Sequence, residues 1–123
     1  MNSAKTTNRV DLIFRAFSDR TRLRILNLLR GGELCVCDLI DVIGAPQAKI
    51  SRHLAYLRKA GLVRARKEGL WQYYSLIEPR GSFHAKMMEC LQCCFKDVPE
   101  LVKDATRLGR KPRCTAVSQC CGS

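Results

Sequence analysis

The 123-residue sequence has no hydrophobic run that approaches the roughly 18 consecutive apolar residues of a membrane-spanning helix. Its N-terminus has no apolar core of the kind found in secretory signal peptides, so we expect a cytoplasmic protein with no membrane association. Acidic residues are also scarce: 11 Asp and Glu stand against 22 Lys and Arg, which gives a formal net charge of +11. This imbalance disfavours an ordinary small enzyme and predicts a polyanionic partner, with nucleic acid as the first candidate.

Cysteine is plentiful for so small a protein, with eight residues. In a secreted chain they would suggest a disulfide framework, but here they are clustered and no export signal precedes them. We therefore expect reduced thiols that bind metal ions rather than structural disulfides. The length allows one domain with a modest core, and domains of this size often complete their burial by dimerising.

Hydrophobic spacing predicts four helices in the first half of the chain. They are expected at residues 10–17, 19–30, 34–43 and 47–60. Glycines mark the ends of the later ones: Gly31-Gly32 follows the second, Gly44-Ala45-Pro46 the third and Gly61 the fourth. Because a tight glycine-containing turn joins the last two helices, they predict a helix-turn-helix.

After Gly61 the pattern changes to β-branched and aromatic residues. Two short runs, residues 62–67 and 71–77, are separated by Glu68-Gly69-Leu70 and predict a β-hairpin that forms a wing. A fifth helix from about Pro79 places an apolar stripe at heptad-like spacing, which predicts a dimer interface. That stripe consists of Phe83, Met87, Cys90, Leu91 and Cys94.

The predicted fold class is therefore mainly α with a β-hairpin wing, a homodimeric winged helix-turn-helix. Residues 1–97 are expected to form the DNA-binding and dimerisation domain. Residues 98–123 are expected to form a short helix from Pro99 and a flexible, basic, cysteine-containing tail. Because a symmetric dimer presents two recognition helices, the expected partner is double-stranded operator DNA with an inverted repeat, its half-sites about one helical turn apart.

The helix expected at residues 47–60 has two distinct faces. Ile50, Leu54 and Leu57 fall within one narrow sector, and the opposite face is small, polar and cationic. Small residues let a helix lie deep in the major groove, where polar side chains reach bases and cations reach phosphates. The candidates for DNA contact are Gln47, Ala48, Lys49, Ser51, Arg52, Tyr56 and Lys59 on the helix, with Arg66 and Lys67 on the wing. Solvation of an exposed helix is the alternative explanation, and His53, nearer the core, is expected to be a hydrogen-bonded structural residue.

Three blocks of the sequence carry a family resemblance. They are Glu33-Leu-Cys-Val-Cys-Asp-Leu39, then Ile50-Ser-Arg-His-Leu54 with Leu57-Arg-Lys-Ala-Gly-Leu62, then Glu68-Gly-Leu-Trp71. Together they closely resemble the arsenical-resistance repressor family, ArsR/SmtB, over residues 8–95. The resemblance implies a dimeric winged-helix repressor, not an enzyme, with residues 47–60 as recognition helix and residues 66–71 as wing. It also implies that the Cys-Val-Cys-Asp-Leu block senses As(III) or Sb(III) as inducer, with no cofactor required for DNA binding.

Cys35 and Cys37 are the first candidates for an ion site. Thiolates select soft ions, namely trivalent arsenic or antimony, bismuth, cadmium, lead, monovalent copper or borderline zinc. At a helix start, unpaired backbone amides lower thiol pKa values. Residues two apart on a helix lie about 200° apart around its axis, so we expect ion binding to unwind this turn and disturb the recognition helix. The family often has a third cysteine where this chain has Ile40, so solvent, a small thiol or another sulfur completes the coordination.

Two further cysteine groups are candidates. The spacing i, i+3, i+4 places three thiols on adjoining positions of one helical face, although cysteine is also readily buried as a small hydrophobe. Some members of the family sense through cysteines of their C-terminal helix. This second cluster is Cys90, Cys93 and Cys94, and a weaker group in the expected tail is Cys114, Cys120 and Cys121.

Other readings of the cysteines are weaker. A thiol oxidoreductase using Cys90-Leu-Gln-Cys93 needs a βαβ scaffold, which the pattern lacks. A zinc ribbon that combines Cys35/Cys37 with Cys90/Cys93 needs knuckle loops rather than helices. The fifth-helix zinc site of the family is disfavoured, because only His84 and Glu89 are available there. Within the repressor class, a cadmium-, lead- or zinc-responsive protein and a redox-responsive protein remain alternatives.

Overall fold

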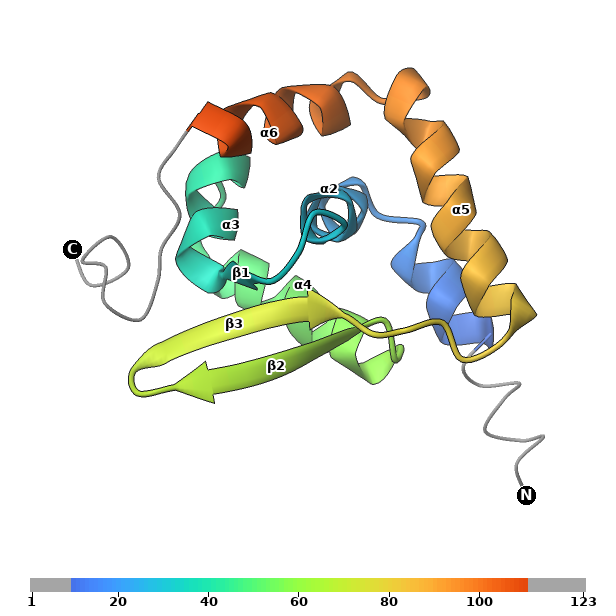
Figure 1. The fold of residues 1–123 in the computed structure, drawn as a ribbon, viewed down its shortest axis with the longest axis horizontal. Coiled ribbons are helices and arrows are strands. Elements are labelled where there is room, and N and C mark those ends of the chain that lie inside the picture. Colours follow the sequence, from blue (N-terminus) through green and yellow to red (C-terminus); the bar gives the residue numbers. More distant parts are fainter. Residues whose placement is uncertain (1–9, 111–123) are drawn as a thin grey trace.

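The helices and strands follow the order expected from the sequence, with one addition (Figure 1). The computed structural model describes residues 10–110, apart from the side chains of residues 94–96. Residues 10–16 are helical, and the later elements are α2 (Arg20–Leu29), β1 (Leu34–Cys35), α3 (Val36–Ile43), α4 (Gln47–Lys59), β2 (Val63–Glu68), β3 (Trp71–Leu76), α5 (Ser82–Asp97) and α6 (Pro99–Arg110). The expected winged helix-turn-helix is confirmed.

Short-range signals determine where several elements begin and end. Asp19 is the N-cap of α2, and its carboxylate accepts a hydrogen bond from the Arg22 backbone N–H at 3.0 Å. Gly44 ends α3 with a φ of 77°, in the left-handed region that favours glycine. Gly69, with a φ of 62°, lies in the turn between β2 and β3. The sequence predicted a helix start, a helix end and a hairpin turn at these same positions.

The addition is β1, a short strand at the point where the sequence predicted the start of the third helix. Leu34 pairs with Tyr74 and Cys35 with Tyr73, so the antiparallel sheet has the order β1-β3-β2. Cys35 has an extended backbone, with φ −71° and ψ 147°, and is the N-cap of α3. The edge of β3 offers backbone hydrogen-bond partners to this segment. This tertiary pairing outweighs the local helical pattern.

The hydrophobic core lies between the helices and the inner face of the sheet. Ile50, Leu54 and Leu57 of α4 are fully buried, and α2 contributes Ile25 and Leu26. Complete burial of an aliphatic side chain of this size stabilises the fold by about 1.5–3 kcal/mol relative to exposure. The shared core therefore holds α4 against α2 and determines which face of α4 points outward.

Helix α6 crosses from the end of α5 to α3, on the opposite side of α2 from the sheet (Figure 1). Pro99 is its first residue, as expected. Leu101, Asp104 and Leu108 are buried where α6 packs on α2 and α3. The expected domain boundary after residue 97 therefore falls between elements that pack together. None of the helices in residues 10–110 is long and apolar enough to cross a membrane.

Candidate DNA-binding surface and thiol site

The outward face of α4 is the first part of the candidate site. Because Ile50, Leu54 and Leu57 face the core, the residues on the opposite side of the helix face solvent. The exposed candidates are Gln47, Ala48, Lys49, Ser51, Arg52 and Lys59. The chain has no acidic residue between Gln47 and Lys67. This surface therefore has the charge that binding to phosphates requires.

Tyr56 differs from the other candidates on α4 because an arginine of α2 covers its ring. The guanidinium carbon of Arg22 lies 4.3 Å from the centre of the Tyr56 ring. Arg22 also donates to the backbone carbonyls of Arg15 at 2.8 Å and Ala16 at 3.2 Å, at the end of the first helix. These contacts hold α4 against that helix. The role of Arg22 could not be predicted from the sequence, because no local pattern pairs it with Tyr56.

His53 lies beside the same arginine, with only 12% of its side chain exposed. Its Nδ1 atom is 3.4 Å from Arg22 Nη1 and 3.8 Å from Asp19 Oδ2. Burial is the main cause that lowers the pKa of His53 below its ordinary 6.5. The negative charge of Asp19 opposes this shift. The positive charges of Arg22, Lys49 and Arg52 lower the pKa further. The neutral ring accepts a hydrogen bond from Arg22, as expected of a structural histidine.

Acidification is expected to destabilise the protein through His53. The unfolded chain takes up a proton near pH 6.5, whereas the folded protein resists it until lower pH, so the free energy of unfolding falls below about pH 6.5. His53→Gln keeps an acceptor for Arg22 and does not titrate. Between about pH 7.5 and pH 5.5 this variant should lose less stability than the wild type in urea denaturation. Equal losses in the two proteins would contradict the prediction.

The wing carries the remaining candidates, Arg66 and Lys67. Lys67 is exposed near the turn of the hairpin. Arg66 donates to both carboxylate oxygens of Glu33, at 3.0 and 2.8 Å, and to Glu68 at 2.6 Å. Hydrogen bonds to the Glu33 and Glu68 carboxylates raise the pKa of Arg66 above its ordinary value, and Glu33 has the larger effect. In this structure Arg66 therefore binds two carboxylates, a role that the sequence pattern did not indicate.

Cys35 and Cys37 lie where α3 meets the wing. Cys35 is 1% exposed and packs with Tyr73 of β3, while Cys37 and Trp71 lie against the same small cluster. Cys37 is disulfide-bonded in this structure. A ligand bound by this cysteine pair would therefore contact α3 and the wing strand β3 together, once Cys37 is reduced.

The position of Cys35 corrects the expected geometry of the pair. Because α3 begins at Val36, Cys35 is not helical, and the separation of about 200° between two helical positions does not apply. The premise that both cysteines lie within the helix is wrong. The two residues lie on either side of the helix start and share one cluster, so their spacing does not by itself require the helix to unwind.

Comparison with known proteins identifies the family. Residues 19–65 match the model of the bacterial regulatory protein, arsR family. The arsenical resistance operon repressor of Escherichia coli (strain K12) is 42% identical over 97 residues, which cover 77% of this chain and 83% of that protein. This chain belongs to the arsR family of bacterial regulatory proteins.

Other proteins similar to this arsR-family chain are also transcription regulators. The cadmium resistance transcriptional regulatory protein CadC homolog of Staphylococcus aureus is 46% identical over 52% of this chain and 54% of that protein. A homodimeric winged helix-turn-helix DNA-binding domain from Mycobacterium bovis has a TM-score of 0.63 and 30% identity, covering 77% of this chain and 85% of that one. The AntR antimony-specific transcriptional repressor has a TM-score of 0.60 and 29% identity, covering 74% of this chain and 80% of that one.

The second cysteine group of this arsR-family chain lies on α5. Cys90 and Cys93 are exposed within the protomer, whereas Leu91 between them is fully buried. Within the described part of the chain, no three His, Cys, Asp or Glu side chains form a group that could hold a metal ion. The remaining candidates lie outside the described residues: the side chain of Cys94, and Cys114, Cys120 and Cys121.

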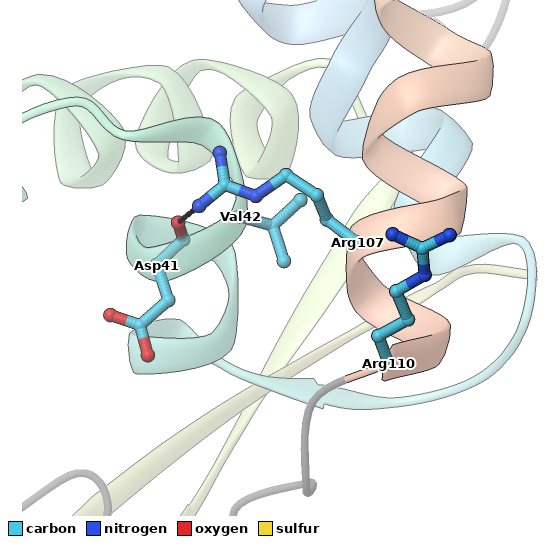
Figure 2. Close-up of a pocket in the computed structure, with 4 residues that line it drawn as sticks. All are labelled: Asp41, Val42, Arg107 and Arg110. Carbon is cyan, nitrogen blue, oxygen red and sulfur yellow. Dashed lines mark hydrogen bonds between the residues drawn. The ribbon is translucent and has the colours of Figure 1, made fainter.

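The C-terminal end of α3 is attached to the rest of the protein by arginines. Arg107 of α6 donates to the backbone carbonyl of Asp41 at 3.0 Å, and Arg24 of α2 donates to that of Ile43 at 3.4 Å. Carbonyls in the last turn of a helix have no partner within the helix, so these side chains satisfy them. An open cavity of about 430 Å³ lies at this contact and is lined by Asp41, Val42, Arg107 and Arg110. Figure 2 shows these four side chains and the hydrogen bond from Arg107 to Asp41.

Proposed function

We propose that this arsR-family protein is a homodimeric transcriptional repressor. Its α4 helix and wing bind double-stranded operator DNA with an inverted repeat, and trivalent arsenic or antimony releases the DNA by binding to Cys35 and Cys37. One observation carries the proposal: the cysteine pair lies at the contact of α3 with β3. A ligand held there touches both the helix that packs on α4 and the strand that forms the wing.

The charge and the exposed side chains of α4 support DNA binding, and the M. bovis structure supports a homodimer. Phe14 is 55% exposed, and its ring centre lies 5.1 Å from that of Phe83 at the start of α5. These aromatic rings give the first helix and α5 an apolar surface for a second copy. Two copies of α4 related by a two-fold axis match the symmetry of an inverted repeat.

The chemistry of sulfur supports a soft inducer. The similarity to the E. coli arsenical resistance operon repressor and to the antimony-specific AntR favours a trivalent metalloid among the soft ions. Ile40 stands where the family often has a third cysteine, so a solvent or small-thiol ligand completes the coordination by two thiolates. Because Cys37 is disulfide-bonded here, metalloid binding starts from the reduced protein.

Two alternatives within the same fold have support of their own. The similarity to the CadC homolog favours a cadmium-responsive repressor. The reversible oxidation of cysteine thiols supports a redox-responsive repressor. Both use the same cysteines, so they differ from the proposal only in what changes the state of the thiols.

In the reduced protein, arsenite is expected to weaken operator binding by about 10- to 100-fold. Fluorescence anisotropy measures the change on a palindromic duplex obtained by binding-site selection, with the reductant removed so that it does not compete for arsenite. Cys35→Ser and Cys37→Ser should each abolish the response but keep operator binding, because they remove a ligand and leave α4 intact. Cys93→Ser, at an exposed position on α5, is the matched control and should keep the response.

The same titration separates the alternatives. Release by cadmium or zinc but not by arsenite or antimonite would exclude the metalloid inducer. Release by peroxide alone would favour the redox-responsive repressor. Loss of the arsenite response in Cys93→Ser but not in Cys35→Ser would move the sensing site to α5. If selection yields no duplex that the protein binds, the repressor proposal itself fails.

A further inference from the structure

Three residues lie in a row across one face of the sheet. Cys35 of β1 and Arg66 of β2 are both direct cross-strand partners of Tyr73 in the central strand β3. Residues directly opposite each other in a sheet point to the same face, so the thiol, the phenol ring and the guanidinium are neighbours. Cys35 of the thiol site and Arg66 of β2 therefore lie on either side of the Tyr73 ring.

Arg66 is held in this row by a ring and two carboxylates. Its guanidinium carbon lies 4.7 Å from the centre of the Tyr73 ring. Two of its nitrogens donate to the two oxygens of Glu33, and a third donates to Glu68. A bidentate pair of this kind constrains the orientation of both partners. Glu33 directly precedes β1, which contains Cys35. Arg66 therefore links this segment to the β2–β3 hairpin.

The space around Cys35 is filled. Cys35 is 1% exposed and Tyr73 is 6% exposed, and Cys37 and Trp71 pack against them. An ion bonded to the thiols adds volume to this cluster, and closely packed interiors accept added volume only when side chains or backbone move. Because the Tyr73 ring packs on Cys35, its movement removes the surface over which the Arg66 guanidinium lies.

We infer that Tyr73, Arg66 and Glu33 transmit occupancy of the thiol site to the wing, and that they are positioning residues rather than DNA contacts. The inference rests on the proposed inducer site and adds a route through the wing to the route through α3. When an ion displaces Tyr73, Arg66 loses its place between the ring and Glu33. The hairpin then changes its orientation relative to α4, and the two elements no longer fit the same DNA.

Two conservative variants test this route. Arg66→Lys keeps the positive charge but removes the planar fork, and Glu33→Gln removes the carboxylate. Each should bind arsenite at least as tightly as the wild type, because the contact between Arg66 and Glu33 no longer opposes movement of the ring. Each should also shrink the arsenite-induced change in operator affinity by about threefold or more. The fluorescence of Trp71 reports arsenite binding, since Trp71 lies in the cluster and is the chain's single tryptophan.

Arg64→Lys and Glu78→Gln are the matched controls, because they make the same chemical changes outside the row. Arg64 is exposed on the same strand and face as Arg66, and Glu78 is exposed beyond the end of β3. Both should keep the wild-type response within about twofold.

The outcomes separate this inference from the proposed function. If Arg66→Lys and Glu33→Gln respond to arsenite as the controls do, the inference fails and the proposed function stands. If the wild-type protein itself does not release DNA with arsenite, both fail. If Arg66→Lys weakens operator binding equally with and without arsenite, Arg66 is a phosphate contact and the inference is overturned.

Discussion

Replacement of Asp104 by alanine is expected to lower the free energy of unfolding by about 2–4 kcal/mol. Asp104 is buried in α6, and its two oxygens accept hydrogen bonds from Arg24 of α2 at 2.7 and 2.9 Å. The substitution leaves the guanidinium of Arg24, whose side chain is only 21% exposed, without its carboxylate. A charge left unpaired at a largely buried position costs more than the ion pair itself contributes.

A second ion pair between the same two helices provides the control. Arg20 and Glu100 are 2.9 Å apart, but their side chains are 57% and 42% exposed. Exposed pairs contribute little, so Glu100→Ala should leave the stability unchanged within error. Urea denaturation at a single protein concentration measures both variants, since dimerisation makes apparent stability depend on concentration. Equal effects of the two substitutions would show that the buried pair does not hold α6 in place.

Arg52→Ala is expected to weaken operator binding by at least about 30-fold at constant salt. Arg52 is exposed on α4, opposite the buried Leu54 and Leu57. A good bidentate contact to a base edge contributes about 1–3 kcal/mol, and a symmetric dimer makes each contact twice. The substitution therefore removes about 2–6 kcal/mol of binding free energy from the complex.

Arg58→Ala is the control for this prediction. Arg58 is exposed on the same helix and carries the same charge, but it lies six residues further on, about 120° away around the helix axis. Its loss should weaken binding by less than about fivefold, through the general attraction to phosphates alone. Anisotropy titrations at one salt concentration compare the two variants. Equal losses would show that α4 binds through its overall charge and not through a contact at Arg52.

The parts of the fold that could be predicted from the sequence depend on local signals. Asp19 caps a helix through its own side chain, and Gly44 ends one through its own backbone conformation. Strand β1 and the docking of α6 could not be predicted, because both depend on distant partners. Cys35 is extended because it pairs with Tyr73, and α6 is attached to α2 through residues 80 positions apart.

The candidate site divides in the same way. The outward face of α4 follows from helical periodicity, which places Ile50 and Leu54 inside and Arg52 outside. The roles of individual cations do not follow, since in the sequence an arginine that binds DNA looks the same as one that binds a carboxylate. Arg66 makes its bidentate contact with Glu33, which precedes it by 33 residues and reaches it through the sheet.

The connection between α5 and α6 has a consequence for the assembled dimer. Only Val98 separates the two helices, and the far end of α6 is attached to α3 through Arg107. The helix that begins between the two cysteines is thus joined by a short path within one protomer to the helix expected at the dimer interface. In the proposed dimer, a shift of α3 is therefore expected to alter the distance between the two recognition helices.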